Sequence, residues 1–292
     1  MKIISTGSYL PNERVTNESI SKDVKWIESK LGIKERRRAA NTSADLGFYA
    51  GMKALQNAFL APRFVDMIIV ATSTPAKMHP STAAIIQYHL GCFNAVAYDI
   101  NAVCSGFVYA MAIAEAFKEK YHNILIIGTD TFSKVTDYTH RNCVFFGDGA
   151  GAIMVRSSPN PLHYKLGTNG TGKDSFKTEW SGTFEMNGKE VFDAGMKYLP
   201  KTIKEALRKA KIEKEEIDYV VPHQASLHML KALAKETGIP FEKFKTNMDR
   251  YGNTAAASIP ILLDENKFEQ GDKLLLVAIG SGWTYGAIVI EW

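Results

Sequence analysis

The stretch DINAVCSGFVYAMAIAEAF, residues 99–117, decides the fold, because a cysteine joins a strand pattern to a helical pattern there. AVAYDI (95–100) is typical of a strand, and after the cysteine apolar residues such as Phe107 and Met111 recur at the spacing of one helical face. Cys104 is therefore predicted at a helix N-terminus, where unpaired N–H groups and the helix dipole favour thiolate over thiol. We expect a nucleophile, although a lone cysteine is more often a small buried hydrophobe.

The rest of the chain alternates strand and helix patterns. Short runs rich in Val and Ile are DMIIVATST (66–74), NILIIGTD (123–130), IDYVVPHQ (217–224) and KLLLVAIGSG (273–282). Helical spacing separates these runs, as at 43–59 and 199–212, which predicts an α/β protein with largely parallel, covered sheets. The order of patterns occurs twice and changes over near 156–165, which predicts two similar halves, 1–158 and 159–292.

Composition excludes several classes of protein. The 292 residues are 46% hydrophobic and carry a net charge of +4, which is too mild to indicate a nucleic-acid partner. The pattern of a signal peptide and an apolar run long enough to cross a bilayer are both missing, so we expect a cytoplasmic protein. The cysteines are odd in number and too widely spaced for a CxxC motif, and the seven histidines lack metal-ligand spacing, so neither a disulfide framework nor a metal site is expected.

The run IKERRRAA concentrates positive charge at Arg36–Arg38. A solvated loop is the simpler interpretation of such a run. A patch for an acidic partner or a phosphate is the functional alternative.

A nucleophilic thiolate that works on acyl groups needs hydrogen-bond donors for the oxygen that becomes negative. His223 in VVPHQAS, Asn253 in RYGNTAAASIP and the glycines of GSGWTYG (280–286) follow later strand patterns and are the candidates. Each has a structural alternative: a capping histidine, a helix-capping asparagine and a glycine turn.

Seven blocks of this sequence, in chain order, resemble one family. They are STGSYLP (5–11), KWIESKLGIKERR (25–37), AVCSGFVYAM (102–111), FFGDGAGA (145–152), PHQAS (222–226), YGNTAAASIP (251–260) and GSGWTYGA (280–287). Together they resemble β-ketoacyl-acyl carrier protein synthase III, a thiolase-fold condensing enzyme. The resemblance implies two duplicated βαβαβαββ halves in a five-layered αβαβα sandwich, and a homodimer.

The resemblance also implies an activity. Cys104 would be the acylated nucleophile, His223 and Asn253 would complete a Cys-His-Asn triad, and the backbone N–H groups of Cys104 and Gly282 would form the oxyanion hole. An acyl group from acyl-CoA would condense with malonyl-acyl carrier protein after loss of CO2, without a metal or redox cofactor. Two alternatives stay open: an acyltransferase that passes the acyl group to an alcohol or amine, and a non-catalytic partner subunit.

Substrate contacts are implied in the same way. Trp26 would stack on the CoA adenine with Arg141 near it, and Gly188 in MNGKEVF would lie near the pantetheine, next to Lys189 where an asparagine is common. His79 would border the acyl pocket of the partner subunit. The carrier-protein surface would include Lys231, Lys235 and Arg250.

Overall fold

A five-stranded sheet of order β1-β7-β6-β4-β5 forms the first half of the computed structural model, which describes residues 1–179 and 182–292. Its strands are β1 (Lys2–Tyr9), β4 (Met67–Ala71), β5 (Val96–Ile100), β6 (Asn123–Asp130) and β7 (Gly149–Arg156). Strand β4 pairs in parallel with β5 and β6, whereas β7 is antiparallel to β1 and β6. All of β4 is buried, as its continuous apolar run predicts.

The second half repeats this sheet. Its strands are β8 (His163–Thr168), β11 (Tyr219–Pro222), β12 (Lys273–Gly280) and β13 (Thr284–Glu291). Their order across the sheet is β11-β12-β13-β8. They correspond in sequence order and pairing to β1, β4, β6 and β7 of the first sheet. A single bridge between Val220 and Phe244 stands where β5 would be.

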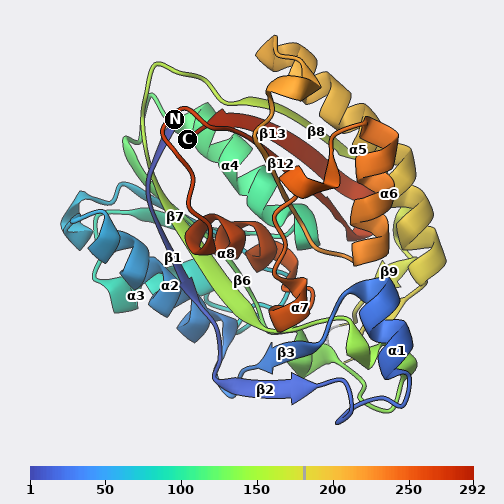
Figure 1. The fold of residues 1–292 in the computed structure, drawn as a ribbon. Helices are drawn as coiled ribbons and strands as arrows, with labels where there is room; N and C mark the ends of the chain where they lie inside the picture. Colours follow the sequence, from blue (N-terminus) through green and yellow to red (C-terminus); the bar gives the residue numbers. More distant parts are fainter. Residues whose placement is uncertain (180–181) are drawn as a thin grey trace.

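Six helices complete the layers in Figure 1: α2 (Ser43–Asn57), α3 (Thr82–Leu90), α4 (Gly106–Phe117), α5 (Gly188–Ala210), α6 (Leu227–Thr237) and α8 (Ser258–Glu265). Helices α2 and α3 cover the outer face of the first sheet, and α5 and α6 cover that of the second. Helices α4 and α8 lie between the sheets and share one apolar core with both. The predicted five-layered thiolase-like sandwich is confirmed, but the prediction of largely parallel sheets is wrong, because β7 and β13 each pair antiparallel with both of their neighbours.

Short elements surround these layers. The strands are β2 (Glu13–Thr16), β3 (Glu35–Arg38), β9 (Phe176–Lys177) and β10 (Glu185–Met186). The helices are α1 (Val24–Trp26), which runs into a π turn at Ile27–Leu31, and α7 (Met248–Tyr251). The 3-10 turns are Pro62–Phe64, Val103–Ser105, Phe132–Val135, Arg141–Val144, Gly170–Gly172, Lys214–Glu216, Phe241–Lys243, Ala255–Ala257 and Ser281–Trp283. Among the helices of the described ranges, none has the length and apolarity needed to cross a membrane.

The prediction of a solvated loop at Arg36–Arg38 is wrong. These residues belong to β3, and the Arg36 side chain is buried, with 3% of the residue exposed. Its guanidinium donates to the carbonyl oxygen of Val144 at 2.7 Å and to the side-chain oxygen of Asn17 at 2.9 Å. Burial lowers the pKa of Arg36 to about 10. Arg36 is thus a structural cation that holds the N-terminal segment to the chain beside Phe145.

The division into units 1–158 and 159–292 stays a prediction. Helix α8 belongs to the second unit by sequence, yet it packs on β1 and β7 of the first sheet.

Candidate active site

Cys104 lies in the turn that connects β5 to α4, where the sequence predicts it. The turn Val103–Ser105 is a 3-10 turn, and α4 begins at Gly106. Gly106 packs closely, since a Cβ there would lie 3.1 Å from the Cβ of Ala71 in β4. Cys104 is buried, with 5% of the residue exposed, so a substrate can reach its sulfur only through a cavity.

His223 and Asn253 come from separate segments of the second half and meet. His223 follows β11, where its backbone N–H donates to the Val277 carbonyl at 2.8 Å. Asn253 follows α7, and its backbone forms a bridge with Phe146. The His223 Nε2 lies 3.1 Å from the Asn253 Oδ1, which also accepts the Ala255 N–H at 2.9 Å. Because that oxygen is an acceptor, we assign the ring proton of His223 to Nε2, and the Asn253 amide hydrogens are left to face a substrate.

Burial dominates the electrostatics of the site. It lowers the pKa of His223 to about 4, so the imidazole is neutral at physiological pH. It also raises the pKa of the Cys104 thiol, and the charge of Asp130 acts in the same direction. Burial therefore acts against the thiolate that the start of α4 was predicted to favour, because desolvation disfavours the charged form.

One apolar cavity of about 320 Å³ contains all three side chains, Cys104, His223 and Asn253. It extends from Trp26, which is 39% exposed, to the buried Cys104. The Arg141 guanidinium lies 5.8 Å from the centre of the Trp26 ring, so these two predicted adenine contacts are brought together. Gly188 also lines the cavity. The shape suits a long, thin substrate arm whose reactive end arrives at the sulfur.

A cluster of four phenyl rings packs beside Cys104: Phe132, Phe146, Phe176 and Phe184. Phe146 stacks on Phe132 at 4.3 Å between ring centres and meets Phe184 edge-on at 5.0 Å. All four rings are buried. An acyl chain on the sulfur would therefore contact buried aromatic rings.

Gly282 lies in the turn between β12 and β13, with φ of 66°. This conformation favours glycine and turns the backbone sharply. The neighbouring Gly280 packs against the nucleophile, because a Cβ there would lie 3.0 Å from the Cys104 nitrogen. The turn is therefore close enough to Cys104 for the predicted pair of backbone donors, which stays a prediction.

The remaining predicted residues lie on the surface. His79 is exposed before Pro80 and is not one of the described residues that line the cavity, so its predicted role depends on a partner subunit. Lys231 and Lys235 are exposed on α6, which begins next to the cavity residue Ser226.

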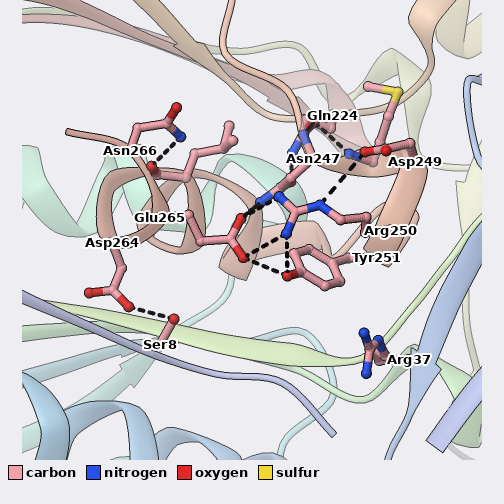
Figure 2. A network of polar contacts seen from close by, with 12 residues as sticks. Ser8, Arg37, Gln224, Asn247, Asp249, Arg250, Tyr251, Asp264, Glu265 and Asn266 are labelled. Atoms are coloured by element: carbon pink, nitrogen blue, oxygen red, sulfur yellow. Dashed lines mark hydrogen bonds and ion pairs between the residues drawn. The ribbon is translucent and has the colours of Figure 1, made fainter. Parts of the chain in front are cut away.

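Arg250 has a structural partner. Figure 2 shows its guanidinium and the Tyr251 hydroxyl on the Glu265 carboxylate, at 3.0 Å and 2.5 Å. Asn247 donates to the same carboxylate at 2.9 Å, and its backbone N–H donates to the Gln224 side chain at 2.8 Å. Gln224 follows His223 directly, so this network also fixes the end of β11.

Lys30 is a cavity residue that the sequence analysis missed. Lys30 lies four residues after Trp26, and this spacing places two side chains on the same face of a helix. The spacing could have predicted that Lys30 lies beside Trp26. A lysine beside the exposed Trp26 adds positive charge where a phosphate-bearing substrate would enter.

Comparison with known proteins agrees with this geometry. The family model described as 3-Oxoacyl-[acyl-carrier-protein (ACP)] synthase III matches residues 98–170, and its C-terminal counterpart matches residues 207–292. A curated β-ketoacyl-[acyl-carrier-protein] synthase III of Clostridium acetobutylicum is 39% identical over 100% of this chain and 98% of its own length. This chain belongs to the 3-oxoacyl-[acyl-carrier-protein] synthase III family.

Solved structures place this synthase III among condensing enzymes. A crystal structure of 3-oxoacyl-[acyl-carrier-protein] synthase III from Aquifex aeolicus superposes with a TM-score of 0.96 at 39% identity, covering 100% of this chain and 99% of that one. The priming β-ketosynthase of the R1128 polyketide pathway gives 0.94 at 29% identity, covering 99% and 96%. The predicted family and the prediction of an acyl-transferring condensing enzyme are confirmed.

Proposed function

We propose that this synthase III condenses an acyl-CoA primer with malonyl-acyl carrier protein, giving 3-oxoacyl-acyl carrier protein, CO2 and CoA. The observation that supports this most strongly is the meeting of Cys104, His223 and Asn253 in one apolar cavity. Such a set supplies a nucleophile and two N–H donors where water is largely excluded. The chemistry needs no resident metal or redox group.

The first half-reaction acylates Cys104. Its sulfur attacks the thioester carbonyl of the acyl-CoA, and the oxygen that becomes negative accepts from the backbone N–H groups of Cys104 and Gly282. The carbon–sulfur bond to CoA then breaks. The thiol proton leaves in this step and ends on the sulfur of CoA, which departs as the free thiol.

The second half-reaction uses the other pair of donors. The Asn253 amide donates to the thioester carbonyl of malonyl-acyl carrier protein, and the His223 Nε2–H turns from the Asn253 Oδ1 to the same carbonyl, so that loss of CO2 leaves a stabilised enolate. The enolate carbon attacks the acyl group on Cys104. The bond to the cysteine sulfur breaks, and the released thiolate takes a proton from water to restore the thiol.

The phenyl cluster limits the primer to short acyl groups. Phe176 and Phe184 pack in the cluster that contains Cys104, and a ring that a longer chain displaced would have to leave a buried, packed position.

A second copy of the chain fits beside β5. This strand ends the first sheet, and exposed apolar side chains gather near it at Tyr88, Phe93 and Val96. Lys231 and Lys235 carry the positive charge that would attract an acidic carrier protein to the cavity entrance.

The test is product analysis with carboxyl-labelled malonyl-acyl carrier protein and a series of acyl-CoAs. We expect 3-oxoacyl-acyl carrier protein and CO2 in equal amounts, with the highest rate for short primers. An enzyme that is acylated but releases no CO2, and that passes the acyl group to an alcohol or amine, would contradict the proposal.

A further inference from the structure

Asp130 is a buried carboxylate at the end of β6 that the proposed mechanism does not use. Its Oδ1 accepts the backbone and hydroxyl hydrogens of both Ser73 and Thr74, at 2.8 to 3.1 Å, and the Thr72 hydroxyl at 3.3 Å. Its Oδ2 accepts the backbone N–H of Ala256 at 3.1 Å. One oxygen thus holds the loop after β4 in the first half, and the other reaches the second half of the chain.

Ala256 belongs to the turn that presents Asn253. The Asn253 Oδ1 accepts the N–H of Ala255, whose φ of 49° lies in the left-handed region that a residue with a side chain seldom adopts. Such a conformation persists only where the surroundings hold it. The turn packs directly on β6, because a Cβ at Gly128 would lie 2.2 Å from the Ala256 carbonyl oxygen.

The same turn contacts the element that bears the nucleophile. A Cβ at Gly106, the first residue of α4, would lie 3.8 Å from the Cβ of Ala256. Asp130 is therefore hydrogen-bonded to the Asn253 turn, which itself packs against the start of α4. Among the charged groups of the described chain, it is the carboxylate whose field acts on the Cys104 sulfur, while the facing His223 is neutral.

We propose that Asp130 is a positioning residue, which holds the Asn253 turn against the nucleophile and places a negative charge near the Cys104 sulfur. The role of Asp130 in holding the Asn253 turn rests on the proposed function. The effect of its charge on the Cys104 thiol does not depend on a malonyl substrate.

The variant Asp130→Asn distinguishes the roles of the two carboxylate oxygens. The asparagine side chain has one acceptor oxygen, and the five donors from Thr72–Thr74 will claim it. The amide NH2 then faces the Ala256 N–H, donor against donor, so the link to the Asn253 turn is lost while the loop after β4 is kept. The negative charge is lost as well.

The test compares the two half-reactions in Asp130→Asn. We expect CO2 release from malonyl-acyl carrier protein to fall about 10²-fold, the usual effect of a misplaced catalytic group, with acylation by acetyl-CoA at pH 8 no slower than in the wild type. Alkylation of Cys104 by iodoacetamide at pH 8 rises roughly tenfold, which corresponds to one pKa unit. Burial raises the pKa of Asp130 to about 6, so the alkylation rates of the two proteins should converge below that pH, where the carboxyl is neutral.

Asp264→Asn is the matched control. This carboxylate of α8 also accepts hydroxyl hydrogens, from Thr6 at 2.8 Å and Ser8 at 2.6 Å, but it faces β1 instead of the site. We expect it to lower the melting temperature without separating the half-reactions or changing the alkylation profile.

Two results would overturn the role of Asp130. One is an unchanged alkylation profile in Asp130→Asn, and the other is an equal loss of acylation and CO2 release in a variant that melts as the wild type does. A wild-type enzyme that releases no CO2 would overturn the proposed function instead, and the alkylation profile would then decide the role of Asp130 alone.

Discussion

Replacing Asn253 by alanine should separate the two half-reactions. The variant loses the amide that donates to the developing enolate, and removal of one such donor costs about 10²–10³ in rate, or about 2.7–4 kcal/mol. It also leaves the buried N–H of Ala255 without the acceptor now 2.9 Å away, which costs about 1–3 kcal/mol of stability. A domain with about 5–15 kcal/mol of stability survives that loss.

The assay for Asn253→Ala measures both steps. Intact mass after mixing with acetyl-CoA should show Cys104 acylated at a rate close to that of the wild type, because the backbone donors remain. Release of labelled CO2 from malonyl-acyl carrier protein should fall by about 10²–10³. Asn253→Asp is the control for the structural hydrogen bond: its carboxylate still accepts the Ala255 N–H, but it supplies no amide donor and repels an enolate. Unimpaired condensation by Asn253→Ala would refute the reasoning.

Three further predictions concern the thiol, the primer and the carrier protein. Alkylation of Cys104 by iodoacetamide should rise with pH and reach no plateau below pH 9, since burial raises the thiol pKa above its ordinary value of 9.0, and a plateau near neutral pH would contradict this. Phe184→Ala should shift the preference among acyl-CoAs toward longer chains, at a cost of about 3–5 kcal/mol in stability, whereas an unchanged preference argues against the cluster as the size limit. Replacing Lys231 and Lys235 by glutamate should raise KM for malonyl-acyl carrier protein more than KM for malonyl-CoA. The control Lys201→Glu on α5 should change neither KM. Equal effects on both substrates would exclude this surface.

The elements that carry the site were predictable because their signals are local. The apolar run at 66–74 and the helical spacing after Cys104 depend only on neighbouring residues, and both gave the correct element. The repeated order of patterns gave the two related sheets. Most of the site residues came from the resemblance, since spacing alone left His223 and Asn253 with structural alternatives.

The features that could not be predicted from the sequence depend on contacts between segments far apart in the chain. Arg36 was predicted to be solvated beside two other arginines, and its burial depends on acceptors that include the Val144 carbonyl, 108 positions away. The helix start next to Cys104 suggested a thiolate, but burial among rings such as Phe184 and the carboxylate of Asp130 both raise the pKa of the thiol. These opposing contributions come from segments that no local pattern connects to the cysteine.

The central claim is that Cys104 carries the acyl group that the malonyl carbon attacks. Peptide mapping by mass spectrometry tests it most directly: the enzyme is loaded with acetyl-CoA, freed of excess reagent and then mixed with malonyl-acyl carrier protein. We expect the acetyl mass on the Cys104 peptide, its disappearance on mixing, and an equal amount of 3-oxoacyl-acyl carrier protein. An acetyl group on another residue, or one that stays on Cys104 after mixing, would contradict the account.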